Sequence, residues 1–192
     1  MKKFSKLAIG LVACFTLAAC GGSSVSAEKF QEEAKKVEPH QYSSATVKYS
    51  LDEDFGMGDA LKASGTIEFT YDQESGWTTN AEDDNAEECA SYLEINVSTF
   101  DASQIDAASY KGVNINYYVN PFKITVKGSD KATDADTGFV TESKVDVSIS
   151  FDKYGFVTNA KMYMSVKMSG EYMGEKVEMS MYMNDTVTIS YK

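Results

Sequence analysis

Apolar and polar residues alternate along most of this chain, most regularly from Val145 to Phe151. A period of two places successive side chains on opposite faces of a β-strand. The same alternation recurs in runs around Val47–Leu51, Ile67–Tyr71, Val113–Val119, Phe122–Val126, Phe156–Met168 and Val177–Tyr191. With a short strand around Trp77, the pattern predicts about six to eight antiparallel strands.

Glycine, proline and polar clusters separate these runs. The sequence DKYG, ending at Gly155, predicts a hairpin turn with a left-handed glycine. Asn120-Pro121 predicts a bulge, an edge or a turn, because proline cannot donate to a sheet ladder. The segments GSDKATDADTG (128–138) and SGEYMGEK (169–176) are predicted to be a polar loop and a turn.

The first helical segment is predicted from Ala27 to about Glu38. Its apolar residues recur three and four positions apart, Ser26 is a suitable N-cap, and Pro39 stops the helix. An amphipathic helix of this kind must pack its apolar stripe against another element.

A second helix is predicted within AEDDNAEECASYLEINV, residues 81–97, where acidic residues gather at the N-terminal end. Its apolar stripe consists of Cys89, Leu93 and Val97. Residues 91–98 also alternate with period two, so a strand competes with the end of this helix.

These elements predict an α+β domain over residues 27–192. Its parts are an N-terminal helix and a curved antiparallel meander with one helical insertion.

The N-terminus has the three regions of a secretory signal. Three lysines precede an apolar run from Leu7 to Ala19, which is too short to span a bilayer. The ending LAAC resembles the bacterial lipobox, and this resemblance implies that Cys20 receives diacylglycerol and becomes the first residue. The expected organisation is a lipoprotein signal peptide (1–19), a lipidated cysteine with a flexible tether (20–26), and a domain anchored on the extracytoplasmic face of the cell membrane. An ordinary cleaved signal is the alternative.

The charge of the chain excludes several partners. The whole sequence carries −11, and loss of the three signal lysines takes the mature chain to −14. An acidic surface repels phosphate backbones and anionic headgroups, so we expect no nucleic-acid partner and anchoring by the lipid itself. The chain also has no arginine, the residue that binds phosphate and carboxylate in a bidentate manner.

The residue inventory argues against an enzyme and against a cofactor. His40 is the only histidine, and the common nucleophile, nucleotide and metal motifs are missing. A pair formed by Cys89 and His40 stays open as an alternative, although the apolar stripe favours a buried, inert Cys89.

The acidic segment that contains Asp130, Asp134 and Asp136 has half the pattern of a calcium loop. The bidentate acid of an EF-hand would fall at position 145, which is valine. A solvated loop is therefore the expected structure, with calcium binding as the alternative and no metal site assigned.

Six of the nine methionines stand at alternate positions on the last two predicted strands. They are Met162, Met164 and Met168 on one strand and Met179, Met181 and Met183 on the next. Adjacent strands would place both columns in one patch, and thioether side chains adapt to ligands of irregular shape. Three interpretations stay open: a plain sheet core, a pocket for an apolar ligand, and a copper(I) site built from sulfur atoms.

The order of the elements resembles the half-barrel lipoprotein-carrier (LolA-like) fold. The segments that carry the resemblance are YYVNPF (117–122) and the final methionine-rich hairpins that begin at FDKYGFVTNAKM (151–162). The resemblance implies a curved sheet around an apolar cavity lidded by helices, although this chain lacks the arginine with which such carriers can hold the lid shut. The expected function is binding or carriage of a lipid-like ligand on the methionine face. The alternative is a surface interaction or scaffold lipoprotein with a filled core, whose exposed Tyr163 and Tyr182 contact a partner protein.

Overall fold

The computed structural model describes residues 24–56, 60–100 and 112–192. The predicted signal peptide and the lipidation site Cys20 lie outside these residues.

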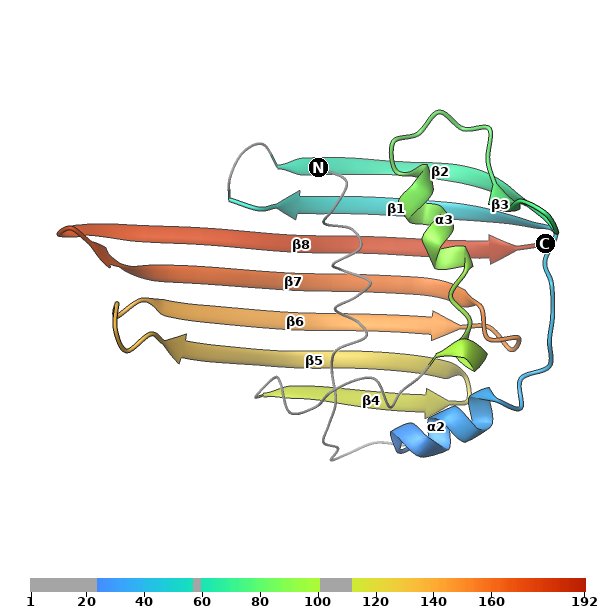
Figure 1. The fold of residues 1–192 in the computed structure, drawn as a ribbon, viewed down its shortest axis with the longest axis horizontal. Helices are drawn as coiled ribbons and strands as arrows, with labels where there is room; N and C mark the ends of the chain where they lie inside the picture. The colour runs from blue at the N-terminus through green and yellow to red at the C-terminus, as the bar shows by residue number, and fades with distance from the viewer. Residues whose placement is uncertain (1–23, 57–59, 101–111) are drawn as a thin grey trace.

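Eight strands form one open antiparallel sheet in the order β3-β2-β1-β8-β7-β6-β5-β4 (Figure 1). The strands are β1 (Ser44–Asp54), β2 (Leu61–Asp72), β3 (Gly76–Thr78), β4 (Val113–Val119), β5 (Phe122–Thr133), β6 (Val140–Phe151), β7 (Val157–Tyr172) and β8 (Glu175–Tyr191). Helices accompany the sheet, so the α+β class is as predicted. The sheet is not closed, and β3 and β4 are its edges.

The order of the strands departs from a simple meander at one place. The last strand, β8, pairs with β7 and also with β1, where Val47 lies opposite Ile189. The hairpin of β1 and β2 is therefore joined to the rest of the sheet through the C-terminal strand. Alternation predicts strands but not this pairing, because the partners are far apart in sequence.

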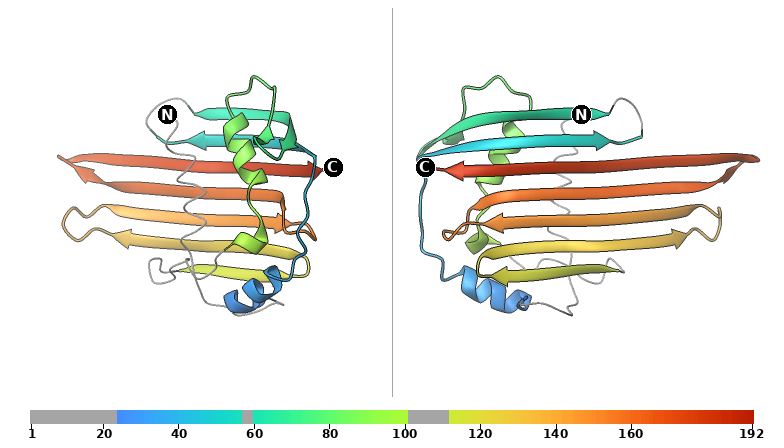
Figure 2. Two further views of the ribbon diagram at one scale, coloured as in Figure 1. Left: turned by 45° about the vertical axis from the view of Figure 1, so that its right-hand side comes forward. Right: turned by 180° about the vertical axis from the view of Figure 1, so that it is seen from behind.

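The helices lie on one side of the sheet. Helix α3 (Ala86–Leu93) crosses the face near β1 to β3, and α2 (Ala27–Ala34) lies beside the edge strand β4 (Figure 2). Phe30 of α2 is fully buried, and its ring centroid lies 5.2 Å from that of Tyr117. Aromatic contacts of this kind attach the helix to the sheet edge.

Helix α2 begins at the predicted cap and ends early. The Ser26 side chain accepts a hydrogen bond from the Lys29 N–H at 3.2 Å. The helix stops at Ala34, short of the predicted limit near Glu38, and the Val37 N–H bonds back only three residues, to the Ala34 carbonyl. Such a tightened turn is a common helix end.

The uncertain segment 91–98 is helical only as far as Leu93. Asn96 then makes an isolated bridge to Phe156, and a short 3₁₀ turn, η1 (Val97–Thr99), follows. All three residues of the predicted stripe are buried. The competing strand does not form.

Two predicted turns are largely strand. Of the predicted loop 128–138, residues up to Thr133 belong to β5 and pair with β6. The predicted turn 169–176 shrinks to Met173 and Gly174, which both have positive φ, 53° and 84°. Positive φ at both central residues is the geometry of a two-residue hairpin turn. Side chains here are mostly exposed on both faces, so no apolar alternation marks these strand ends.

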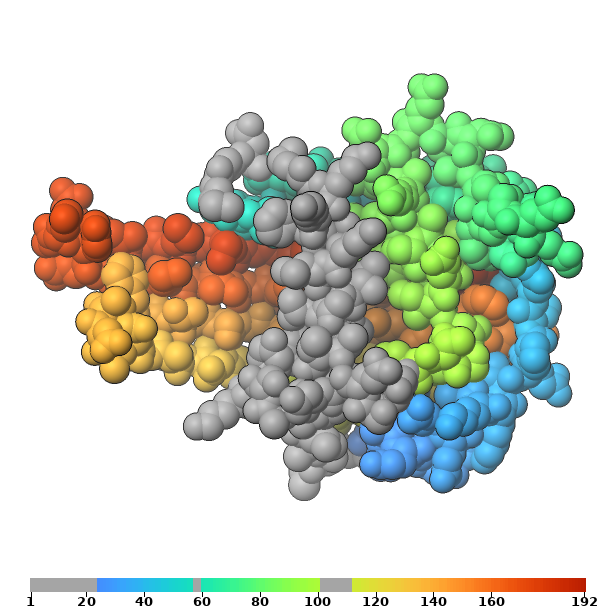
Figure 3. All heavy atoms as spheres, viewed as in Figure 1, coloured from blue at the N-terminus to red at the C-terminus, as the bar shows by residue number. Residues whose placement is uncertain are grey.

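The core occupies only part of the sheet. Side chains on the helix-bearing face are buried near α2 and α3, whereas residues 171–180 at the β7–β8 turn are all exposed. In Figure 3 this hairpin projects beyond the rest of the molecule. The described helices therefore cover this apolar face at one end only.

Candidate functional site: the methionine strip

The register of β7 and β8 brings the two methionine columns together. Met164 lies opposite Met183, Val166 opposite Met181, and Met168 opposite Met179. Neighbouring strands are about 4.8 Å apart, so side chains in these positions touch across the ladder. We call the six methionines together with Val166 the methionine strip.

Burial decreases along the strip. Met162 and Met183 are 6% and 7% exposed, Met164 packs partly against the core, and Met179 is 41% exposed. The described helices lie near the opposite end of the sheet from the β7–β8 turn (Figure 1). The strip therefore runs from the filled core to an open apolar surface.

Two carboxyl groups interrupt the apolar face beside the buried end of the strip. Asp185 of β8 is 3% exposed and lies opposite Met162, and Glu53 of β1 is 9% exposed and lies opposite Met183. The backbone N–H of Asp52 donates to Asp185 Oδ1 at 3.3 Å. A buried carboxylate needs such donors, because it has lost its contact with water.

Asp185 and Glu53 belong to the paired strands β8 and β1, and both side chains are buried on the same face of the sheet. Burial, followed by repulsion from the neighbouring Glu53, raises the pKa of Asp185 to about 8. Glu88 of α3 faces the same pair, and burial raises its pKa too. Sequence reasoning missed this cluster, although both acids stand at positions where alternation expects an apolar side chain.

Cys89 has the environment of a structural thiol. It belongs to α3 and is 2% exposed, and burial raises its pKa to about 12. A thiol that stays protonated is a poor nucleophile. His40 is exposed and stacks on Tyr154 with ring centroids 3.9 Å apart, so the structure does not bring these two described residues together.

The acidic segment considered for calcium is split between two elements. Asp130 belongs to β5, whereas Asp134 caps the turn into β6 by accepting hydrogen bonds from Asp136 and Thr137. These bonds lower the pKa of Asp134. Within residues 24–56, 60–100 and 112–192, no group of three or more His, Cys, Asp or Glu side chains has the geometry to hold a metal.

Comparison with known proteins gives no relative: no family model, curated protein or solved structure matches the chain. Among the described residues no helix is long and apolar enough to cross a membrane. The function must therefore be argued from the site itself.

The raised pKa of Asp185 predicts a pH-dependent stability. The folded state binds the proton of the Asp185 carboxyl more tightly than the unfolded chain does. The stabilisation that results is complete below about pH 4 and is lost as the pH rises through about 8. Asp185→Asn removes the ionisable group and so should remove this loss of stability at high pH. The variant should be more stable than wild type at pH 8.5 by about 1 to 3 kcal/mol. Urea unfolding between pH 5 and pH 8.5 measures the difference.

Asp136→Asn is the matched control, since it removes the same charge from an exposed turn. The free energy of unfolding of this variant should differ from that of wild type by a nearly constant amount over the same range of pH. If Asp185→Asn gave an equally flat difference in the free energy of unfolding, burial would not be raising the pKa of Asp185.

Proposed function

We propose that the chain is a lipid-anchored extracytoplasmic lipoprotein whose domain binds an apolar, lipid-like ligand on the open end of the methionine strip. The observation that carries the proposal is the gradient of burial along the strip, from Met162 and Met183 in the core to the exposed Met179. An apolar surface continuous with the core allows a ligand to extend that core and remove its outer end from water.

The chemistry of the strip suits a flexible ligand. Methionine is unbranched and adapts its shape, whereas the β-branched residues usual in strands are stiff. Burial yields about 0.8 kcal/mol per methylene, so eight methylenes supply roughly 6 kcal/mol before ordering costs. That is enough for a measurable affinity for an acyl chain.

The proposed anchor would hold the domain close to the bilayer. The Val25 N–H donates to the Tyr117 carbonyl at 2.7 Å, which attaches the chain before α2 to β4. A tether of residues 20–24 reaches about 18 Å at most. The domain as a whole would then lie close to membrane lipid.

The open sheet with helices on one side is compatible with the half-barrel carrier layout expected from the sequence. A helix-lidded cavity is a finer feature, and it remains part of this proposal. Two depressions among the described residues lie elsewhere, one on the opposite face and one near Tyr42 and Tyr71. We therefore place the ligand on an open surface.

The alternative is a surface interaction or scaffold lipoprotein without a small ligand. The deep burial of Met162 and Met183 favours it, because these two residues fill the core as ordinary apolar side chains do. A protein partner would then cover the open end of the strip.

The anchor is tested by the substitution Cys20→Ser. Without the thiol no diacylglycerol can be attached, and we expect the protein to leave the membrane fraction and to change its electrophoretic mobility. Fractionation of the expressing cells measures both. Unchanged membrane retention would show that the anchor lies elsewhere.

The ligand site is tested with Met168→Ser/Met179→Ser in the mature chain that carries Cys20→Ser. The change removes two apolar side chains from the open end, so binding of a fluorescent polyene fatty acid should weaken about tenfold or more. A fluorescence titration gives the affinity. Thermal unfolding should change little, because neither residue is fully buried.

Met173→Ser is the matched control, because this methionine is 88% exposed at the turn and lies outside the strip. Its affinity for the probe should stay within about twofold of the parent. The proposal fails if the parent protein does not bind the probe, or if both variants bind it as well as the parent does.

A further inference from the structure

The face of the sheet opposite the helices is polar throughout. On each strand it carries the residues that alternate with the core positions, such as Lys161, Tyr163 and Ser165 on β7. In the register they stand beside Ser148, Asp146 and Lys144 of β6. An antiparallel sheet with one solvated face normally shows this pattern.

The charge on this face differs from that of the molecule. The chain carries −11 overall. On β5, β6 and the part of β7 before residue 171, the polar face bears six lysines. They are Lys123, Lys127, Lys131, Lys144, Lys161 and Lys167. Only two acids, Glu142 and Asp146, stand among them. An acidic protein therefore has a local positive surface, which attracts anions.

Both acids already have partners. Asp146 pairs with Lys127 at 3.1 Å and Glu142 with Lys131 at 2.6 Å. Lys144 and Lys161 form no ion pair with any described residue, and the Lys144 ammonium lies 5.4 Å from the centroid of the Tyr163 ring. Lys144 and Lys161 are thus among the lysines left to balance the charge of a ligand.

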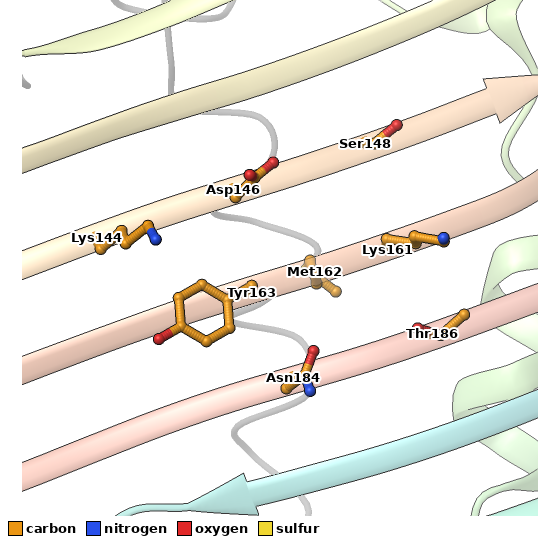
Figure 4. Close-up of a pocket in the computed structure, with 8 residues that line it drawn as sticks. All are labelled: Lys144, Asp146, Ser148, Lys161, Met162, Tyr163, Asn184 and Thr186. Atoms are coloured by element: carbon orange, nitrogen blue, oxygen red, sulfur yellow. The ribbon is translucent and has the colours of Figure 1, made fainter.

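These two lysines border a shallow depression of about 400 Å³ (Figure 4). Its lining consists of Lys144, Asp146 and Ser148 from β6, Lys161, Met162 and Tyr163 from β7, and Asn184 and Thr186 from β8. Figure 4 shows the side chains along three neighbouring strands, with the Tyr163 ring between Lys144 and Asn184. The set combines two cations, one aromatic ring, hydroxyl groups and an amide with a single carboxylate, Asp146, which is already paired with Lys127.

We propose that this depression binds a carboxylate-bearing glycan, a sugar chain of the uronic-acid type. The ammonium groups of Lys144 and Lys161 pair with the sugar carboxylates. The Tyr163 ring offers an apolar surface for the C–H groups of a sugar ring. The amide of Asn184 and the hydroxyls of Ser148 and Thr186 exchange hydrogen bonds with sugar hydroxyls.

The lining favours a glycan over a nucleic acid. Nucleic-acid sites follow a phosphate chain with many basic groups and stack several bases on aromatic rings. This depression has one ring and two unpaired lysines, and the rest of the molecule is acidic. The site also lies on the face opposite the methionine strip and does not depend on the proposed lipid function.

The test is calorimetric titration of the mature chain carrying Cys20→Ser with an oligogalacturonate, at low salt. The same oligosaccharide in fully methyl-esterified form keeps the sugar chain and removes the charge. We expect binding of the acid form, which weakens as salt is added. Binding of the ester should be at least about tenfold weaker.

Lys144→Gln/Lys161→Gln should weaken binding of the acid form by about tenfold or more, and Tyr163→Ala should weaken it severalfold. Lys35→Gln/Lys36→Gln is the matched control, since it removes the same charge from two exposed lysines just after α2. It should leave the affinity within about twofold. All variants should keep the thermal unfolding midpoint of the parent, which separates loss of the glycan site from misfolding.

Four results would overturn the proposal. The parent protein fails to bind the acid oligosaccharide, the ester binds equally well, the Lys144→Gln/Lys161→Gln variant keeps its affinity, or oligothymidylate binds as tightly as the glycan. The last result would show a site for polyanions in general.

Discussion

The ladder between β8 and β1 is the constraint on which the rest of this structure depends. It joins the N-terminal hairpin to the five strands β4 to β8, and it aligns their core positions on one face. A slip by one residue would turn the columns around Val47 and Val187 to water and bring lysines and threonines beneath the helices. The same register keeps the lysine-rich surface of β5 to β7 on the opposite face.

The helices are too short to cover this face from end to end. Helix α3 spans eight residues, about 12 Å, whereas β8 spans 17 residues. The apolar face therefore has a filled part beneath the helices and an open part towards the β7–β8 turn. Asp185 and Glu53 lie on this face beside the buried end of the strip, where each costs solvation energy, and for Asp185 the hydrogen bond from the Asp52 N–H partly offsets that cost. The pair makes the filled part sensitive to pH, and the open strip beyond it consists of uncharged side chains.

Alternation was sufficient to predict most of the sheet. It gave the paired runs around Val47 and Ile67, the strand from Val145 to Phe151, and the adjacency of the two methionine columns. The alternation did not predict the ends of β5 and β7, because a strand that is exposed on both faces has no alternating apolar residues. The polar loop and the turn predicted there were wrong for this reason.

The rest of the site depends on pairing between distant segments. Glu53 and Asp185 stand 132 positions apart along the chain, and only the pairing of β1 with β8 brings them together. Lys144 and Lys161 belong to separate strands whose register could not be fixed from the chain alone. The burial of Cys89 could be predicted from the sequence, by contrast, because a helical stripe is a local pattern.

The central claim is that one apolar face is filled at one end and takes a lipid-like ligand at the other. Hydrogen exchange of the mature chain carrying Cys20→Ser, measured by mass spectrometry with and without oleate, tests it most directly. The account predicts that amides of residues 164–168 and 179–183 gain protection when oleate is added, while those of 187–191, already paired beneath the covered face, stay unchanged. Equal exchange with and without oleate throughout β7 and β8 would contradict it.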